Sequence, residues 1–197
     1  MAVDVIEDQD GARIVRVLAP LTEADVLALR AGDRVRLNGV IWTARDAAHA
    51  RLAALDEAGE EWPFPAEGAI LYYAGPTPTR PGQVIGSAGP TTASRMDSLT
   101  EMTLRHGVKA VMGKGERGSE VRAALREHRA VALAAIGGLG AILARSITSS
   151  EVVAFGELGT EAIRRLEVSD FPAVVVHDAH GGDLYADARS HWRAASA

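Results

Sequence analysis

Hydrophobic and polar positions alternate along the first half of the chain in a pattern typical of short strands and helices. Residues 14–18 (Ile-Val-Arg-Val-Leu) are rich in β-branched side chains, which predicts a strand with Val15 and Val17 on one face. Residues 22–29 begin with a threonine three positions before an aspartate. This is the spacing of a capping box, and it predicts a short helix.

A second strand-rich stretch follows. The apolar runs 34–37 and 40–42 flank Asn38-Gly39, and because both turn residues tolerate positive φ, the pattern predicts a β-hairpin. Thr43 and Asp46 repeat the capping-box spacing and predict a second helix. The apolar face of this helix would consist of Ala44, Ala48, Leu52 and Leu55.

The second half alternates regularly between strands and helices. Helices are predicted over residues 94–106, 119–128 and 159–166, and strands over 69–73, 108–112, 130–136, 152–155 and 173–177. Such alternation implies crossover connections and a mostly parallel sheet. A seam rich in Gly and Pro, residues 74–89, separates the two halves and predicts no regular element in its middle. The predicted fold class is α/β, with a β-rich N-terminal part and an alternating β/α C-terminal part.

Composition narrows the class of protein. The chain has 197 residues, 47% of them hydrophobic, and this composition is ordinary for a globular protein. Its net charge of −5 argues against nucleic acid or an anionic membrane as partner. Cysteine is absent, so this chain ligates no iron–sulfur cluster and no thiolate zinc, and it has no cysteine nucleophile. The acidic residues 1–10 lack a leader pattern, and the uncharged stretch 130–144 is too short to span a membrane. We therefore expect a cytoplasmic protein.

One candidate site lies where the seam enters a predicted helix. Gly89-Pro90-Thr91-Thr92 leads into this helix, whose free backbone N–H groups attract anions. Arg95 falls in the first turn and is suited to bidentate binding of a carboxylate. The alternative is an ordinary helix cap with a solvated arginine.

Further cationic residues recur at comparable positions. Arg45 begins an earlier predicted helix, and His49 follows one turn later. His49 could act as a general base or be a packed side chain. The alternative for both residues is a solvated polar face. Lys114 follows a predicted strand, at the edge where open α/β sheets bind ligands. The sequence is equally compatible with a surface turn here, and it lacks the spacing of a P-loop. Residues 137–140 (Gly-Gly-Leu-Gly) lack dinucleotide-binding spacing. Two arginines, a lysine and threonines suit a small dianionic substrate, and they resemble part of an active site whose remaining chemistry comes from elsewhere.

These residues coincide with those of a known family. Over most of its length the chain closely resembles the beta subunit, or C-terminal domain, of class I iron–sulfur fumarate hydratases and L(+)-tartrate dehydratases. The landmarks are residues 32–33 (Gly-Asp), 35–39 (Val-Arg-Leu-Asn-Gly), 44–49 (Ala-Arg-Asp-Ala-Ala-His), 72–76 (Tyr-Tyr-Ala-Gly-Pro), 89–92 (Gly-Pro-Thr-Thr), 95–97 (Arg-Met-Asp), 114–115 (Lys-Gly), 157–163 and 168–173.

The resemblance implies a three-layer swivelling β/β/α domain over residues 1–197. It implies an alpha subunit that carries a 4Fe–4S cluster on its own cysteines, in an alpha2beta2 hetero-oligomer, and a C4-dicarboxylate substrate. The implied reaction is the reversible hydration of fumarate to L-malate, a step of the tricarboxylic acid cycle. The implied roles are a base for Thr91, carboxylate binding for Arg45 and Arg95, and substrate contact for Lys114, with no metal bound by this chain.

Two alternatives remain open at this point. The chain could serve an L(+)-tartrate dehydratase or a hydratase of a related dicarboxylate, or it could be a non-catalytic module for assembly or anion binding. Ser94 and Glu116-Arg117-Gly118 depart from the family pattern and leave the substrate open. We expect the partner-facing surface around residues 74–89 and 137–140.

Overall fold

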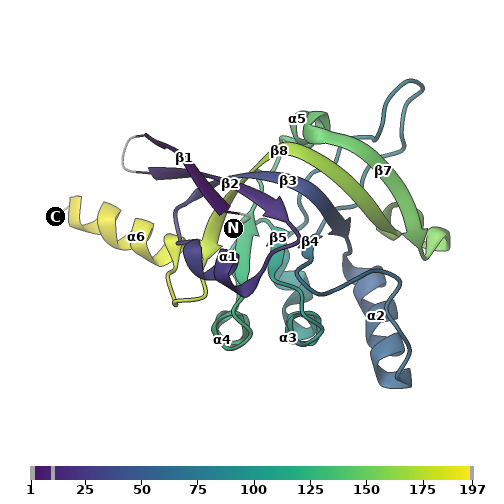
Figure 1. The fold of residues 1–197 in the computed structure, drawn as a ribbon, viewed down its shortest axis with the longest axis horizontal. Coiled ribbons are helices and arrows are strands. Elements are labelled where there is room, and N and C mark those ends of the chain that lie inside the picture. Colours follow the sequence, from purple (N-terminus) through teal and green to yellow (C-terminus); the bar gives the residue numbers. More distant parts are fainter. Residues whose placement is uncertain (1–2, 10–11, 196–197) are drawn as a thin grey trace.

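The structure, a computed structural model, describes residues 3–9 and 12–195 and contains an eight-stranded sheet with helices packed against it (Figure 1). The strand order is β1-β2-β3-β4-β5-β6-β8-β7. The strands are β1 (Val3–Gln9), β2 (Ala12–Ala19), β3 (Arg34–Thr43), β4 (Ile70–Tyr72), β5 (Ala110–Gly113), β6 (Val131–Ala134), β7 (Ile147–Ala154) and β8 (Ile163–His177). Residues 1, 2 and 10 of the acidic N-terminal segment lie outside the described residues.

The sheet closes on itself because β3 and β8 pair over most of their lengths. Their antiparallel register runs from Arg34 opposite Val174 to Thr43 opposite Arg164. The end of β8 also pairs with β6, so β3, β4, β5, β6 and β8 form a small barrel-like ring. Strands β2 to β6 are parallel to their neighbours in this series, which confirms the mixed α/β class and the predicted crossovers.

Helices α2, α3 and α4 lie on one side of the molecule, whereas α6 projects from another (Figure 1). The helical segments are α1 (Glu23–Ala28), α2 (Asp46–Ala58), η1 (Ala93–Met96), α3 (Asp97–Arg105), α4 (Ser119–Glu127), α5 (Gly140–Leu143), η2 (Ala144–Ser146), η3 (Gly156–Glu161) and α6 (Leu184–Ala195). The capping box predicted before α1 is confirmed, since Thr22 and Asp25 exchange backbone-to-side-chain hydrogen bonds of 3.2 and 2.9 Å. In the part of the chain that the structure describes, every helix is too short or too polar to cross a membrane.

The hairpin predicted at Asn38-Gly39 is wrong, because β3 continues through both residues. Gly39 has φ +93°, and a Cβ there would lie 2.7 Å from the carbonyl oxygen of Ala19 on the neighbouring strand. The register between β3 and β8 shifts between Leu37 and Gly39. The glycine therefore forms a bulge in a strand that has partners on both edges, and not a turn.

The predicted cap of α2 and the helix predicted over residues 159–166 are wrong, although α2 itself is confirmed. Thr43 does not cap α2: its hydroxyl donates to the Ala162 carbonyl at 3.2 Å and accepts from the Arg164 N–H at 3.0 Å, tying β3 to β8. The N-cap residue of α2 is Arg45. The helix predicted over residues 159–166 is replaced by the end of η3 and the start of β8, because pairing with β3 and β7 satisfies this backbone as a strand.

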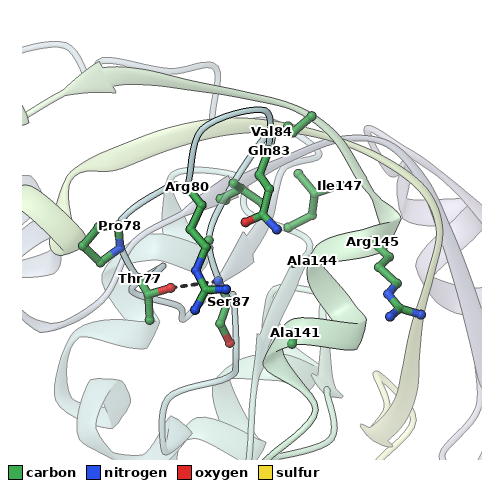
Figure 2. A pocket seen from close by; sticks show the side chains of 12 residues that line it. Thr77, Pro78, Arg80, Gln83, Val84, Ser87, Ala141, Ala144, Arg145 and Ile147 are labelled. Atoms are coloured by element: carbon green, nitrogen blue, oxygen red, sulfur yellow. Dashed lines mark hydrogen bonds between the residues drawn. The ribbon is translucent and has the colours of Figure 1, made fainter.

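The Gly/Pro-rich seam forms a loop that projects beside α5 (Figure 1). Its base is closed by two hydrogen bonds, from the Thr77 N–H to the Ser87 carbonyl at 3.0 Å and from the Ser87 N–H to the Thr77 hydroxyl at 2.9 Å. Together with α5 and η2 the loop encloses a pocket of about 570 Å³ (Figure 2). The side chains of Arg80, Gln83, Val84 and Ile147 are among those lining it.

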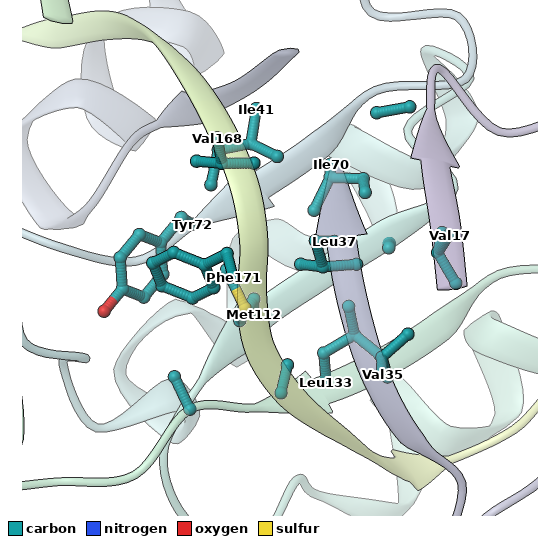
Figure 3. Close-up of a cluster of buried hydrophobic side chains, with 14 of the residues drawn as sticks. Val17, Val35, Leu37, Ile41, Ile70, Tyr72, Met112, Leu133, Val168 and Phe171 are labelled. Carbon is teal, nitrogen blue, oxygen red and sulfur yellow. The ribbon is translucent and has the colours of Figure 1, made fainter. Parts of the chain in front are cut away.

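The core has two parts because the central parallel strands are buried on both faces. Inside the ring, Tyr72 meets Phe171 edge to face at a centroid distance of 5.4 Å, among Leu37, Ile70 and Met112 (Figure 3). The other part fills the space between the sheet and α2, α3 and α4. It includes Leu52, Leu71, Tyr73, Met96, Val111 and Leu125.

Candidate functional site

The four predicted site residues meet at the carboxyl edge of the parallel strands. Arg45 lies just beyond the end of β3, and Lys114 directly follows β5. The Thr91 N–H donates to the carbonyl of Tyr73, which follows β4, at 2.6 Å, and the Thr91 carbonyl accepts from the Lys114 N–H at 3.0 Å. Ligands bind at this edge in open α/β sheets because the loops after successive strands converge there.

Arg45 is held at the start of α2 between two carboxylates. Its Nε lies 3.3 Å from Asp46 Oδ2 and its Nη2 lies 3.3 Å from Glu161 Oε1. The second oxygen of Glu161 accepts from the Ala47 N–H at 2.7 Å, so this residue also satisfies a free donor at the helix start. A Cβ at Gly75 would lie 2.9 Å from Arg45 Nη1 and 3.2 Å from the Thr160 carbonyl oxygen, so the chain at Gly75 passes close to the guanidinium.

Arg95 lies in η1, and its side chain shares a partner with Arg45. Its Nε donates to Asp46 Oδ1 at 2.8 Å, so one carboxylate joins both arginines. Burial raises the pKa of Asp46, but its own backbone N–H and the charges of Arg95 and Arg45 outweigh this effect and hold the pKa below its usual range. Asp46 therefore remains ionised and keeps the two guanidinium groups close together.

Lys114 extends from the neighbouring strand end toward the loop after β6. A Cβ at Gly137 would lie 3.3 Å from its Cδ and 3.9 Å from its Nζ. The Lys114 carbonyl accepts from the Ala93 N–H at 2.8 Å, which attaches the lysine to the segment between Thr91 and Arg95. The ammonium group is exposed at the same edge as the two arginines.

His49 lies beneath this edge, on the turn of α2 that follows Arg45. It is fully buried, with Nδ1 3.1 Å from the Arg45 carbonyl and its ring edge-on to Tyr73 at 5.3 Å. Burial, reinforced by the charge of Arg117, lowers the pKa of His49 to about 4, although the Arg45 carbonyl acts in the opposite direction. The imidazole is thus neutral near pH 7 and has no path to solvent, which favours a packed side chain over a general base.

Gly140, the last glycine of the Gly-Gly-Leu-Gly segment 137–140, allows two loops to approach closely. A Cβ at Gly140 would lie 2.5 Å from Ser87 Oγ and 2.8 Å from the Gly89 nitrogen, and the Gly140 carbonyl accepts from the Ala88 N–H at 3.0 Å. This contact joins the loop after β6 to the loop after β4. Close packing against Ser87 and Gly89 accounts for Gly140, and a φ of +81° accounts for Gly138, without a bound dinucleotide.

The residues of this chain do not fit a metal cluster. Over residues 3–9 and 12–195, no three His, Asp or Glu side chains are grouped so that they could hold a metal ion. Cysteine, the usual ligand of iron–sulfur clusters, is absent from the sequence. No step of a reaction is therefore assigned to a cluster on this chain.

Sequence reasoning missed three residues that organise the site: Asp46, Glu161 and Arg117. Asp46 had a signal, because it directly follows Arg45 in the sequence. Glu161 had none, since 116 positions separate it from Arg45 and only the pairing of β8 with β3 brings η3 to the start of α2. Arg117 lies in a charged, glycine-rich turn that is typical of the surface, yet it is buried.

The fold and the site together define a class of protein: an α/β chain that gathers two arginines, a lysine and a threonine at one edge of its sheet, a set of groups suited to an anionic ligand. Comparison with known proteins agrees. The family model described as "Fumarase C-terminus" matches residues 2–188, and the chain belongs to this family.

Individual relatives are identical to this chain at about two fifths of the aligned positions. Fumarate hydratase 2 of Leishmania major is 44% identical over 78% of this chain and 28% of its own. The anaerobic class I fumarate hydratase of Escherichia coli K12 is 43% identical over 86% of this chain and 30% of its own. A protein of Methanocaldococcus jannaschii with the provisional name L(+)-tartrate dehydratase subunit beta is 39% identical over 84% of this chain and 88% of its own. The chain thus spans about 30% of the fumarate hydratases but most of the separate beta subunit.

Proposed function

We propose that this chain is the beta subunit of a class I hydro-lyase that reversibly hydrates fumarate to L-malate and is active only with an alpha subunit. The observation that carries the proposal is the meeting of Arg45, Thr91, Arg95 and Lys114 at one sheet edge, with both arginines joined through Asp46. Membership of the fumarase C-terminus family supports the reaction class.

In this proposal the cations bind the two carboxylates of the substrate. Arg45 and Arg95 are suited to bidentate binding, and Lys114 supplies a third positive charge from the next strand end. Thr91 accepts the proton from C3 of malate as the hydroxyl group leaves C2, and returns it in the direction of hydration. A hydroxyl group is a weak base near pH 7, so Thr91 needs a positive charge to stabilise its deprotonated form. We propose that Lys114, whose N–H donates to the Thr91 carbonyl, supplies this charge.

The rest of the reaction belongs to the alpha partner. We propose that the partner holds the 4Fe–4S cluster, which would supply a Lewis acid for the departing hydroxyl, in an alpha2beta2 assembly. The length of the fumarate hydratases supports this division, because about 70% of their sequence lies outside the match. We also propose that residues 1–197 form one swivelling β/β/α domain and that the protein is cytoplasmic.

The surface that would meet the partner is apolar and next to the site. Val84 on the seam loop is 49% exposed, and Ile136 and Ile142 beside the loop after β6 are 59% and 52% exposed. Exposed apolar side chains that gather on one surface are typical of protein interfaces. Ile136 precedes Gly137, which lies against the Lys114 side chain, and this supports an active site completed by the second subunit.

Two other functions remain. The near full-length match to the Methanocaldococcus protein favours an L(+)-tartrate dehydratase or a related dicarboxylate hydratase as the second candidate. All these acids carry two carboxylates, so the arginines do not separate them. A non-catalytic module for assembly or anion binding would not depend on Arg95 for turnover.

The deciding experiment is reconstitution with the alpha partner under anaerobic conditions and assay on malate, tartrate and mesaconate. Arg95→Ala should lower kcat/KM by roughly 10- to 150-fold, because charged hydrogen bonds contribute about 1.5–3 kcal/mol. Arg105→Ala is the matched control: Arg105 is 53% exposed and ion-paired to Asp56 at 2.7 Å, whereas Arg95 is 51% exposed and paired at 2.8 Å. Activity on none of the three acids, or equal effects of the two variants, would contradict the proposal.

A further inference from the structure

A cluster of buried polar side chains lies beneath the four site residues and has no role in the reaction proposed above. It consists of His49, Tyr73, Asp97, Thr100 and Arg117, and we call it the Arg117 cluster. The Arg117 side chain is only 1% exposed, which is unusual for a charged group. Burying a cation is unfavourable unless partners surround it, so the partners of Arg117 indicate what it stabilises.

Arg117 contacts three side chains at once, two of them on α3 and the third directly after β4. Its Nε donates to Asp97 Oδ1 at 2.7 Å, its Nη2 donates to the Thr100 hydroxyl, and its guanidinium lies 5.5 Å from the centre of the Tyr73 ring. The second oxygen of Asp97 accepts from the Gly118 N–H at 2.8 Å. One aspartate at the start of α3 therefore fixes two successive residues of the loop after β5.

Each of these contacts leads to a residue of the candidate site. Lys114 belongs to the same loop as Arg117, and Arg95 lies two residues before Asp97. The carbonyl of Tyr73 accepts from the Thr91 N–H, and the ring of Tyr73 packs against His49, one turn after Arg45. Arg117 is thus connected, directly or through Tyr73, to the segments that carry all four site residues.

The loop that carries Lys114 needs such an anchor. Gly113, Gly115 and Gly118 fall within six residues, and Gly115 has φ +85°, so the local sequence restricts this backbone little. On the solvent side the loop also forms an ion pair between Glu116 and Arg189 of α6, but both side chains are about half exposed. Exposed pairs contribute little, so the buried contacts of Arg117 dominate.

We propose that Arg117 is a positioning residue, which sets the distance between Lys114 and Arg95 without touching the substrate. This inference rests on the proposed function. The planar guanidinium is needed because it reaches a carboxylate and a hydroxyl in two directions while its face covers an aromatic ring, and a lysine ammonium cannot make these contacts together.

The test uses the complex reconstituted with the alpha partner. Arg117→Met should raise KM for the dicarboxylate at least tenfold and lower kcat/KM at least a hundredfold, whereas Arg117→Lys should lower kcat/KM about tenfold. Leu125→Ala is the control for stability alone: Leu125 is fully buried on α4 in the same core, away from the site edge, and its truncation should lower Tm and leave KM unchanged.

The partner residue gives a second, milder route. Asp97→Asn keeps the shape of the side chain and removes its charge, and Asp97 is 24% exposed, so this variant should fold even where Arg117→Met does not. The losses in kcat/KM from Asp97→Asn and Arg117→Lys should be less than multiplicative in the double variant, because both disturb one contact.

The outcomes separate the two proposals. If the unaltered complex is active and both Arg117→Lys and Asp97→Asn keep its KM, Arg117 has only a structural role and the inference is wrong. If the unaltered complex is inactive on every acid, the proposed function fails. The positioning role of Arg117 is then tested by NMR on this chain, without an activity assay. The amide NMR signals of Thr91 and Lys114 should then shift in Asp97→Asn, and unchanged signals would overturn it.

Discussion

The buried imidazole of His49 should make the stability of this chain depend on pH between 6.5 and about 4. His49 is completely buried and neutral, and its pKa is about 4 in the folded chain against 6.5 in the unfolded one. The charged groups that act on it are Arg117, which lowers the pKa, and Asp46, which raises it. Between pH 6.5 and 4 the unfolded state therefore binds a proton that the folded state does not bind.

The sign and size of the effect follow from this difference. Stability rises with pH wherever the unfolded state binds more protons, so the His49 contribution is complete above pH 6.5 and is lost as the pH falls toward 4. At about 1.4 kcal/mol per pKa unit the full loss is about 3 kcal/mol, of which about 2 kcal/mol is already lost at pH 5.

The measurement is urea unfolding at pH 7 and pH 5 for the wild-type chain and for His49→Gln, which keeps a donor for the Arg45 carbonyl but does not titrate. The variant should lose about 2 kcal/mol less than the wild type on acidification. His177, whose pKa burial also lowers, and the carboxylates are present in both proteins and cancel in the comparison. Equal losses, or a His49 ring that titrates near pH 6.5 by NMR, would refute the reasoning.

Other substitutions test the fold directly by urea unfolding. Gly39→Ala combines a positive φ with a Cβ 2.7 Å from the Ala19 carbonyl oxygen and should lower the free energy of unfolding by roughly 3 kcal/mol. Gly59→Ala is the control, because Gly59 has φ +69° but open space around it, and it should lose only about 1 kcal/mol; similar losses would argue against the bulge. Tyr72→Phe removes the 2.7 Å hydrogen bond from the Tyr72 hydroxyl to the buried Ala88 carbonyl and should lose about 1–3 kcal/mol, and an unchanged stability would contradict that role.

Local patterns in the sequence predicted those elements whose structure depends mainly on their own residues. The capping box at Thr22 and the central strands from β4 to β6 are examples, because short apolar runs alternate there with amphipathic helices. The position of Lys114 at the carboxyl edge followed from the same alternation.

The failures lie where a distant strand determines the outcome. Asn38-Gly39 would suit a hairpin, but β2 and β8 provide partners on both sides of β3 and extend it through the glycine. Residues 163–166 have apolar spacing compatible with a helix, yet pairing with β3 and β7 makes them a strand. The roles of Glu161 and Arg117 depend on the same long-range pairing and on burial, which a single sequence does not reveal.

The two carboxylates beside Arg45 have a consequence for selectivity among acids. Asp46 and Glu161 are tethered competitors, present next to the guanidinium groups at a high effective concentration whether or not a ligand is dissolved. An incoming acid gains only the difference between its own ion pairs and those it displaces or shares. If the arginines bind the substrate as proposed, a monocarboxylate would exchange one ion pair for another at almost no gain, whereas an acid with two charges would reach both arginines together. Asp46 and Glu161 would then select ligands by their number of charges.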